Sequence, residues 1–317
     1  MTMIVVGLDG GGSRTRALVA DERGNEIVSV EGPASAVRPG MAEASADVLA
    51  ALVRDALAAA AMEHVTPKVV CAGVAGVGRE AERDALWQAL SSREIADDVV
   101  VHADATVALD DAFGDGAGVL LVAGTGSVAF ARGPTGTFAR CGGWGPVIGD
   151  EGGGAWLGRR ALSVVTASSD GREPATALVG AILTAAEVES VEELIPWAAE
   201  ATPTRLAALA PAVLQTAEAG DLRANALLSI AVEELVLHVR TLGRQLFVDE
   251  RALIPVALAG GLLGRGSPLR RRLEHRIKTA VPGAHVRAEA VVPVRGAVRG
   301  ALRFLGLVPE PEESVGA

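Results

Sequence analysis

Two glycine-rich segments carry hydroxyl and carboxyl groups in a pattern typical of phosphate binding. The first comprises Asp9, Gly10, Gly11, Gly12, Ser13, Arg14 and Thr15, and the second comprises Gly124, Thr125, Gly126 and Ser127. Glycines adopt positive φ and let a ligand approach the backbone, so that successive amides form an anion nest. Ser13 and Thr15 add hydroxyl donors, and Asp9 is placed to hold Mg²⁺ through water. A tight hairpin turn with a capping aspartate also explains the first segment.

The context of the second segment argues against two common nucleotide motifs. Its glycines formally match a dinucleotide-binding fingerprint, but that motif requires a helix after the loop. Residues 128–133 have a strand pattern instead, and neither lysine of the chain follows a glycine, so there is no P-loop. Two hairpins of glycines and hydroxyls fit a clamp on one polyphosphate. Gly260 and Gly261 are either a strand-to-helix turn or a flat shelf for an adenine ring.

Asp104 stands between a strand pattern at residues 99–102 and a helix pattern that starts at Ala105. An aspartate at this place is typical of a helix N-cap, and it is also well placed to accept a proton from a substrate hydroxyl. His102 and Asp104 would supply two metal ligands, but the sequence offers no third one nearby.

The densest concentration of glycines lies between Cys141 and Gly154, around one tryptophan and two acids. Seven glycines beside carboxylates favour a loop that contacts substrate over a purely structural one. Asp150 would accept hydrogen bonds from substrate hydroxyls. Glu151 would do the same or cap the following helix.

Composition excludes several classes of protein. The 317 residues include 29 Lys and Arg and 39 Asp and Glu, for a net charge of −10, and 50% are hydrophobic. No basic field is available for nucleic acid or an anionic membrane surface. The two cysteines, Cys71 and Cys141, are too few for a disulfide framework and are interpreted as packing residues. With no signal peptide and no apolar run of ~18 residues, we expect a cytoplasmic protein without a membrane span.

The apolar pattern predicts an α/β protein in which one unit occurs twice. Strands are expected at 5–9, 14–20, 25–31, 68–75 and 98–102, and helices at 42–64, 79–90 and 105–113. The order then restarts with strands at 117–123, 128–132 and 137–141, a helical insertion over 154–248, a strand at 255–259, a helix at 268–281, a strand at 285–288 and a helix at 296–305. Each half opens with a three-strand meander that has a glycine loop after its first strand. Two such units facing each other would place both loops at the cleft between them.

In the same order along nearly the whole chain, these motifs resemble the BadF/BadG/BcrA/BcrD ATPase family, and within it the N-acetylglucosamine kinases. The most specific part is Cys141-Gly142-Gly143-Trp144-Gly145 followed by Gly149-Asp150-Glu151-Gly152. The resemblance implies an actin/hexokinase-type fold of two ribonuclease-H-like domains with an interdomain active-site cleft. One domain would comprise residues 1–114 with a C-terminal helix at 295–308, and the other residues 115–294. Residues 309–317 would be a disordered acidic tail.

The resemblance further implies a kinase that uses ATP and Mg²⁺ and acts on an amino sugar, with Asp104 as the base at the sugar 6-hydroxyl. We also expect a homodimer. The residues expected near ATP are Asp9, Gly10, Gly11, Gly12, Ser13, Thr15, Gly124, Thr125, Gly126, Ser127, Gly260 and Gly261, with Asp9 near Mg²⁺. Those expected near the sugar are Ser35, Asp104, Thr125, Gly126, Cys141, Gly142 and Asp150.

The sequence departs from the family in one loop and leaves alternatives open. Family kinases often have an asparagine after the third strand that contacts sugar hydroxyls; residues 32–37 contain none, and Ser35 is a shorter substitute. N-acetylglucosamine, glucosamine and muramic-type sugars are therefore not separated. An ATPase activator of an acyl-CoA dehydratase, which needs exposed cysteines for an iron–sulfur cluster, is disfavoured by the two cysteines present. A non-catalytic sugar sensor is disfavoured by Asp104.

Overall fold

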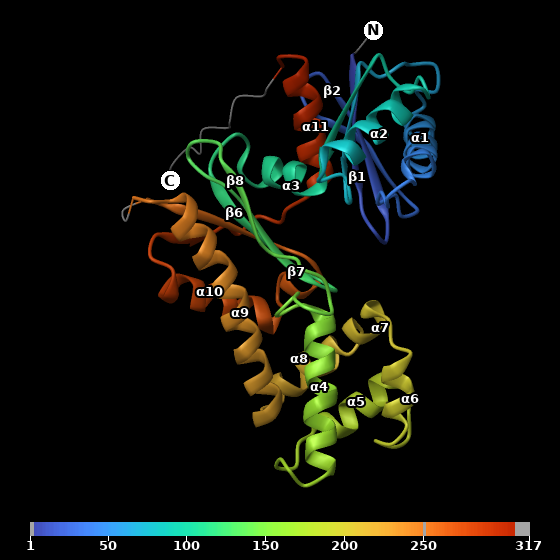
Figure 1. Cartoon of the computed structure of the whole chain (residues 1–317). Coiled ribbons are helices and arrows are strands. Elements are labelled where there is room, and N and C mark those ends of the chain that lie inside the picture. Colours follow the sequence, from blue (N-terminus) through green and yellow to red (C-terminus); the bar gives the residue numbers. More distant parts are fainter. Residues whose placement is uncertain (1–2, 250–251, 308–317) are drawn as a thin grey trace. The chain divides into compact units, whose positions relative to one another are not determined.

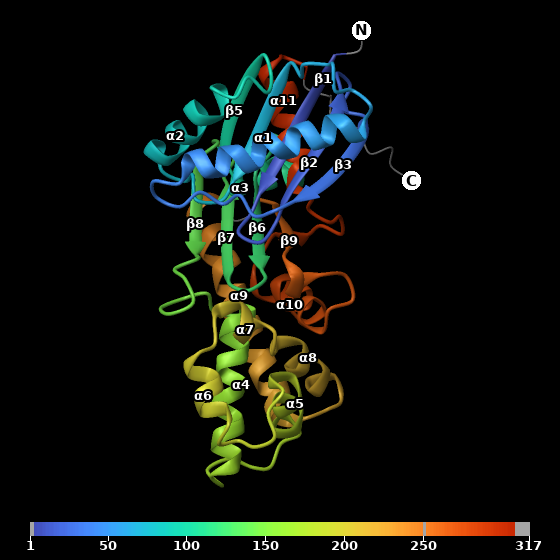
Figure 2. The same ribbon diagram turned by 90° about the vertical axis from the view of Figure 1, so that its right-hand side faces the viewer.

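The computed structural model describes residues 3–249 and 252–307, which form two compact α/β units (Figures 1 and 2). The first unit consists of the chain up to Gly116 together with the chain from Val291, and the second is Ala117–Ala290. Each unit contains a five-stranded mixed sheet. The acidic tail expected at 309–317 lies outside the described residues.

The sheet of the first unit has the strand order β3-β2-β1-β4-β5, in which β1 is antiparallel to β2 and parallel to β4. Along the register, Asp9 is paired with Gly73, and Gly73 with His102. The carboxyl ends of three parallel strands therefore lie at one edge of this sheet. The strands are β1 (Ile4–Gly10), β2 (Thr15–Asp21), β3 (Glu26–Gly32), β4 (Val69–Val74) and β5 (Asp98–Ala103).

Helices cover both faces of the first sheet because its strands alternate apolar side chains to either side. One face packs against α1 (Ala42–Ala59) and α2 (Glu80–Ser91), and the other against α3 (Asp104–Phe113) and α11 (Pro293–Phe304). Figure 2 shows α1 in front of this sheet and α11 behind it. The three glycines at 7, 296 and 300 allow α11 to approach closely: a Cβ on Gly7 would lie 2.6 Å from the Val294 carbonyl oxygen.

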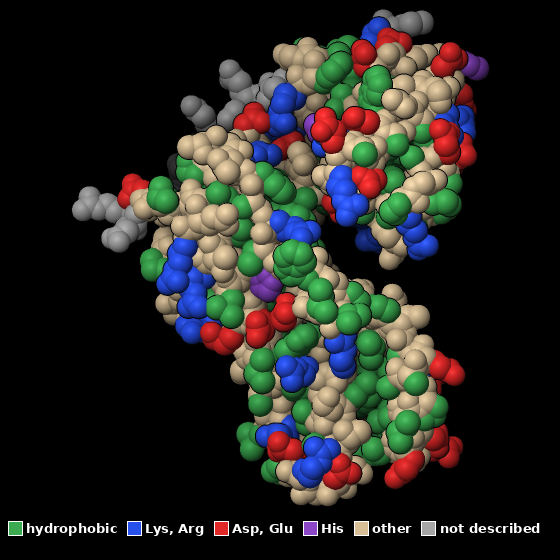
Figure 3. Space-filling model, in the orientation of Figure 1, with side chains coloured by type: hydrophobic (Ala, Val, Ile, Leu, Met, Phe, Trp, Pro, Cys, Tyr) green, Lys and Arg blue, Asp and Glu red, His purple; other side chains and the backbone are tan. Residues whose placement is uncertain are grey.

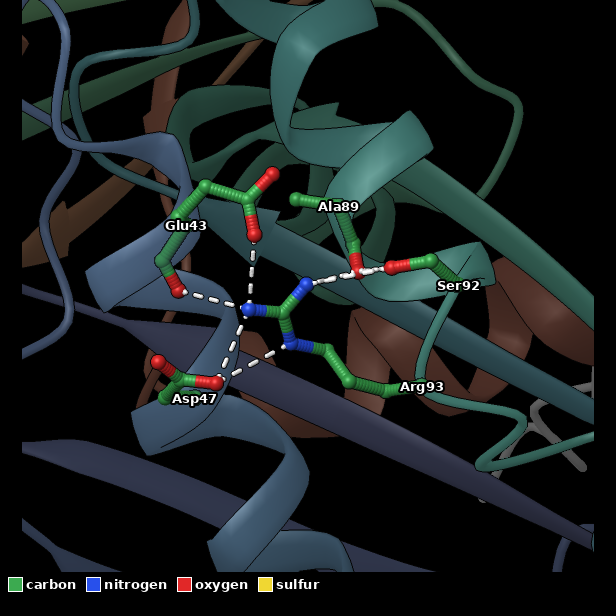
Figure 4. Close-up of polar contacts among 5 residues, drawn as sticks. All are labelled: Glu43, Asp47, Ala89, Ser92 and Arg93. Carbon is green, nitrogen blue, oxygen red and sulfur yellow. Dashed lines mark hydrogen bonds and ion pairs between the residues drawn. The ribbon is translucent and has the colours of Figure 1, made fainter.

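Arg93, just after α2, ties α2 to α1 (Figure 4). Its Nη2 lies 2.8 Å from Glu43 Oε2 and 2.8 Å from Asp47 Oδ1, both on α1. Its Nη1 donates to the Ala89 carbonyl. The Arg93 side chain is only 18% exposed, while the Glu43 and Asp47 side chains are 76% and 72% exposed, so the contacts link the two helices at the protein surface.

The second unit repeats the topology with the strand order β10-β9-β6-β7-β8, where β6 is antiparallel to β7 and parallel to β9. β6 and β9 thus correspond to β1 and β4 of the first unit. The strands are β6 (Gly118–Ala123), β7 (Ser127–Arg132), β8 (Phe138–Gly142), β9 (Ile254–Ala259) and β10 (Ala284–Val286). The turn η1 (Gly261–Leu263) and the helix α10 (Pro268–Ala280) follow β9.

The predicted helical insertion comprises six helices. They are α4 (Gly154–Ser169), α5 (Leu178–Ala186), α6 (Leu194–Ala199), α7 (Pro203–Ala207), α8 (Ala210–Glu218) and α9 (Leu222–Leu246). Asp221 caps α9 by accepting hydrogen bonds from the amides of Arg223 and Ala224, both at 2.9 Å. The ends of α4 and α9 distant from the sheet share a separate apolar core with α5, α6 and α8. Charged residues of both signs are interspersed over the face in Figure 3.

The predicted α/β class and the repeated meander are confirmed, and the differences are at element ends. The helix expected at 42–64 ends at Ala59, since the chain turns through Ala61 at a φ of +55°. The helix expected from Ala105 begins at Asp104. In the described residues, no helix is both long and apolar enough to span a membrane.

Candidate functional site

In the first unit, the glycine loop after β1 lies directly against the loop after β3. The Gly11 carbonyl accepts hydrogen bonds from the amides of Ser35 and Ala36, at 3.1 and 3.2 Å. A Cβ on Gly10 would lie 2.5 Å from Ser35 Oγ. Ser35 is thus placed beside the candidate phosphate loop, but it is only 2% exposed.

Thr15 and Ser35 form a buried pair of hydroxyls. Thr15 Oγ1 lies 2.8 Å from Ser35 Oγ and 2.6 Å from the Pro33 carbonyl oxygen, and the Thr15 side chain is fully buried. As placed, the two hydroxyls hold the loop after β3 against the glycine loop. Their expected contacts with ATP and sugar would require that pair to open.

The tip of the first loop is open to solvent. The loop closes through a 3.0 Å hydrogen bond from the Gly11 amide to the Arg14 carbonyl, while Gly12 and Ser13 are exposed. Among the described residues, no backbone group pairs with the amides of Gly12 and Ser13. Arg14 adds a cation, with a side chain 61% exposed and 3.6 Å from Glu31 Oε1. Sequence reasoning missed this cation, although an arginine within the loop was a visible signal.

The expectation that these loop glycines serve to provide positive φ is wrong. Gly10, Gly12 and Gly126 all have φ outside the left-handed region. Gly10 and Gly126 are instead required because a neighbouring side chain occupies the space of a Cβ. At Gly10 and Gly126, glycine is therefore needed for close packing and not for a special backbone conformation.

Asp9 and Asp104 form an electrostatically coupled pair of carboxyls at the carboxyl edge of the first sheet. Burial, and then the neighbouring charge of Asp104, raise the pKa of Asp9 to about 6, against smaller opposing effects of Arg16 and Arg14. Burial also raises the pKa of Asp104. Two carboxyls with raised pKa values in one place are typical of sites that bind cations or transfer protons.

Asp104 is the first residue of α3, and Ala103 occupies the N-cap position. The alternative interpretation of Asp104 as the N-cap is therefore wrong by one residue. Its Oδ1 accepts a 2.9 Å hydrogen bond from the Ala105 amide, and the described residues provide no side-chain partner for the carboxylate. A half-buried carboxylate held on one side in this way is able to accept a proton from a bound hydroxyl.

In the second unit, the β6–β7 loop caps the first turn of α4. The Gly124 carbonyl accepts from the Gly154 amide at 2.8 Å, and the Thr125 carbonyl accepts from the Ala155 amide at 2.9 Å. These bonds satisfy two amides at the helix start that otherwise lack partners. The Thr125 side chain is exposed. Ser127 Oγ donates to the Glu151 carbonyl at 2.6 Å and is buried.

Asp150 lies over the same loop in an uncommon backbone conformation. Its φ is +58°, in the left-handed region that aspartate tolerates better than most non-glycine residues. Its Oδ1 accepts a 3.1 Å hydrogen bond from the Gly145 amide. A Cβ on Gly126 would lie 2.2 Å from its Oδ2. Among the described residues, no donor reaches Oδ2, so this oxygen is available to a ligand hydroxyl.

The glycine shelf after β9 lies at the edge that also carries the β6–β7 loop. Gly260 has a φ of +95°, and a Cβ there would lie 2.2 Å from the Ala123 carbonyl oxygen. A Cβ on Gly124 would lie 4.0 Å from the Gly261 amide nitrogen, whereas Gly261 itself faces open space. The second unit thus brings together the β6–β7 loop, the glycine-rich run and the segment after β9. The first and the last of these are more than a hundred residues apart in the sequence.

Cys141 and Gly142, at the end of β8, face the long helix α9. The Cys141 thiol is half-buried against the core and hydrogen-bonded by Thr241, and burial raises its pKa. A Cβ on Gly142 would lie 2.2 Å from Nε2 of His238, whose Nδ1 is 2.7 Å from the Glu234 carbonyl oxygen. His238 is a buried polar residue beneath the glycine-rich run that sequence reasoning missed.

The described residues contain no group of three or more His, Cys, Asp or Glu side chains arranged to hold a metal. Mg²⁺ at kinase sites generally needs only one or two carboxylates, because phosphate and water supply the other oxygens. Asp9 fits that requirement: no donor among the described residues reaches its carboxylate, and burial together with the neighbouring Asp104 charge raises its pKa, so a bound cation would stabilise its ionised form.

Comparison with known proteins gives consistent matches along the chain. The chain is 28% identical to an N-acetyl-D-glucosamine kinase of Dictyostelium discoideum, covering 94% of this chain and 98% of the relative. It is 29% identical to an N-acetylmuramic acid/N-acetylglucosamine kinase of Clostridium acetobutylicum, covering 82% and 85%.

A solved structure extends the match to the fold. The structure of a protein described as a putative N-acetylglucosamine kinase from Chromobacterium violaceum superposes with a TM-score of 0.76 at 28% identity, covering 94% of this chain and 98% of that chain. The model of the BadF/BadG/BcrA/BcrD ATPase family matches residues 6–304. The chain therefore belongs to the BadF/BadG/BcrA/BcrD ATPase family.

Proposed function

We propose that this protein is an ATP-dependent amino-sugar kinase that transfers the γ-phosphoryl group of ATP to the 6-hydroxyl of N-acetylglucosamine or a close relative. The observation that carries the proposal is Asp104, a half-buried carboxylate with raised pKa beside a second carboxylate at a strand edge. The names of the two curated relatives support the substrate class. Glucosamine and muramic-type sugars are the nearest alternatives.

Asp104 acts as the general base in this proposal. Its carboxylate accepts the proton of the sugar hydroxyl as that oxygen attacks the γ-phosphorus, and the raised pKa brings its basicity closer to neutral pH. The Ala105 amide holds one oxygen and leaves the other to face the hydroxyl. Such a base typically contributes about 10²–10⁴-fold to the rate.

The glycine loops bind the phosphates in this proposal. The exposed amides of Gly12 and Ser13 and the Thr125 hydroxyl are donors of the kind that stabilises phosphate oxygens. Arg14 contributes a positive charge in a chain that has no lysine near either loop. Gly261, where a Cβ would meet no atom within 4 Å, leaves open space for the adenine ring. Because phosphoryl transfer needs little covalent work from the protein, positioning and charge neutralisation account for most of the catalysis.

Asp9 would hold Mg²⁺, directly or through water. The bound cation would neutralise charge on the phosphate oxygens during transfer. The carboxylate of Asp9 must be ionised for this role, and its pKa of about 6 keeps it ionised at neutral pH.

Asp150 orients the sugar. Its free Oδ2 is placed to accept hydrogen bonds from sugar hydroxyls, while the Gly145 amide fixes Oδ1. Hydrogen bonds to a charged acceptor contribute roughly 1.5–3 kcal/mol each.

Release of ADP over a panel of amino sugars tests the proposal. We expect rapid release with N-acetylglucosamine or one of its relatives, and little release when no sugar is added. Release that is equally fast without sugar would contradict a kinase and favour an ATPase. Sugar binding without any ADP release would favour a sensor.

A further inference from the structure

The helix that carries the proposed base is packed against a helix from the other end of the sequence. α3 begins with Asp104, and α11 lies against it in the first unit (Figure 1). A Cβ on Gly296 of α11 would lie 1.8 Å from the Val107 carbonyl oxygen and 2.8 Å from the Asp111 amide nitrogen. The two backbones therefore approach so closely that no side chain fits between them at this point.

Apolar packing between these helices involves only small or β-branched side chains. They are Val107 of α3 and Val294, Ala297, Val298 and Ala301 of α11. Helices fix each other's position when the ridges of one fit the grooves of the other, and small side chains form only low ridges. Because apolar contacts are also non-directional, the place of α3 on α11 depends on additional polar contacts.

Two neighbouring acids of α3 supply such contacts at opposite ends of α11. Asp111 Oδ2 accepts a 2.6 Å hydrogen bond from the amide of Val292, directly before the helix. Asp110 Oδ2 lies 2.9 Å from Nη1 of Arg303, in the last turn of the helix. Contacts at two separated points resist both sliding and rotation of α3 on α11.

The burial of Asp110 favours a role in position over a role in stability. Its side chain is fully buried, whereas that of Arg303 is 35% exposed and also lies 2.5 Å from Asp115 Oδ1, beyond the end of α3. Burial of a charge costs free energy, and a buried ion pair often stabilises a fold no more than apolar residues of similar size. The best-attested use of buried polar groups between helices is to fix how the helices fit together.

Asp104 depends on the position of α3. It is the first residue of the helix, and its Oδ1 accepts from the Ala105 amide of the same helix. Asp111 follows Asp104 by about two turns, so the two acids lie on one face of α3. A shift of α3 would therefore move the base, and a displacement of about 1 Å at a catalytic group can lower a rate by as much as about 10²-fold.

Resting on the proposed function, we infer that Asp110 and Arg303 are positioning residues that hold α3, and with it the base Asp104, in place for the sugar hydroxyl. Neither residue contacts a substrate in this account. They act on the rate of transfer through the place of the base, and the residues that bind ATP and sugar are unaffected.

The double variant Asp110→Leu/Arg303→Met tests the inference, because it removes both charges of the pair together. We expect kcat, counted per ATP-binding site by calorimetry, to fall by about tenfold, and the KM values for sugar and ATP to change by less than about twofold. Arg303→Lys keeps a cation and should retain at least about a third of kcat. Arg295→Met, which removes an exposed ion pair between α11 and Glu26, is the matched control and should leave kcat unchanged.

A second background separates positioning from stability. In Asp104→Asn no base remains to be positioned, so the double variant should lower the residual rate by less than about twofold. A fall of about tenfold in both backgrounds, or an unchanged kcat in the double variant, would overturn the inference.

Arg303→Gln keeps the test decisive if the double variant does not fold, since its amide still donates to Asp110. It should lower kcat by about threefold with Asp104 present and by less than about 1.5-fold in Asp104→Asn. Equal falls in both backgrounds, or no fall in either, would overturn the inference. Absence of any sugar-dependent ADP release from the wild type would instead refute the proposed function.

Discussion

The two glycine hairpins occupy the same place in the repeated topology and are built differently. The loop after β1 ends in exposed residues, with Gly12 facing open space and Arg14 beside it. The loop after β6 is enclosed by the glycine-rich run, and its carbonyls cap α4. The same pair of strands therefore supports an open donor loop in one unit and a packed platform in the other.

This difference indicates which ligand group each loop suits. Open amides and a cation fit a phosphate, which needs several donors. The second loop has two sides: its exposed Thr125 hydroxyl is a phosphate donor, and the carboxylate of Asp150 fits a neutral ligand with hydroxyl donors, because no cation within the described residues pairs with it.

Loss of the base in the first unit should have the largest effect. Asp104→Asn should lower kcat by about 10²–10⁴-fold, or roughly 3–5 kcal/mol, because the amide cannot accept the hydroxyl proton. Binding of ATP and sugar, measured by calorimetry, should persist. Asp98→Asn, an exposed residue at the other end of β5, is the control. A variant that retains more than about a tenth of kcat would remove Asp104 from the role of base.

The carboxyl pair should also give the first unit a distinct pH dependence. The pKa of Asp9 is about 6 in the folded protein and near 3.8 in the unfolded chain. Between these two pH values, the folded state therefore binds more protons than the unfolded state. The contribution of Asp9 to the free energy of unfolding is therefore fully present below about pH 4. It falls by at most about 3 kcal/mol as the pH rises through about 6. Asp9→Asn should remove that loss. Urea unfolding at pH 4.5 and 7 measures it, and equal differences in wild type and variant would contradict the assignment.

In the second unit, the sugar site should respond to Asp150 without a change in nucleotide affinity. Asp150→Asn keeps a side chain that tolerates a positive φ and accepts from Gly145, but it removes the charge. We expect the sugar KM to rise at least about tenfold, which corresponds to 1.4 kcal/mol. The affinity for ATP without sugar should barely move. A fall in ATP or Mg²⁺ affinity at constant sugar KM would place Asp150 near the metal instead.

Two alanine substitutions contrast the loops directly and should have the smallest effects. Gly126→Ala places a methyl group 2.2 Å from Asp150 Oδ2 and should raise the sugar KM several-fold. A Cβ on Gly12 would meet no atom within 4 Å, and the φ of Gly12 lies outside the left-handed region. Gly12→Ala should therefore fold normally and change the sugar KM by less than about twofold. If Gly126→Ala impaired only ATP binding, the platform role of the second loop would be wrong.

Local patterns predicted the sheets, because alternation and turn residues are properties of short segments. The contacts that define the site were not predictable in the same way. The Thr15–Ser35 pair and the Gly126–Asp150 approach join residues twenty or more positions apart, and only the folded chain brings them together. The glycines were recognised, but the expected reason, positive φ, was wrong at Gly10 and Gly126. Their neighbours across the fold determine the need for glycine.

Phosphorus NMR of the reaction product tests the central claim most directly. With ATP, Mg²⁺ and N-acetylglucosamine, the wild type should form a phosphate ester whose signal couples to the two protons on C6 of the sugar. Asp104→Asn, at equal sugar occupancy, should form it at least about a hundredfold more slowly. Inorganic phosphate as the main product, or an ester formed equally fast by both proteins, would contradict an amino-sugar kinase that uses Asp104 as its base.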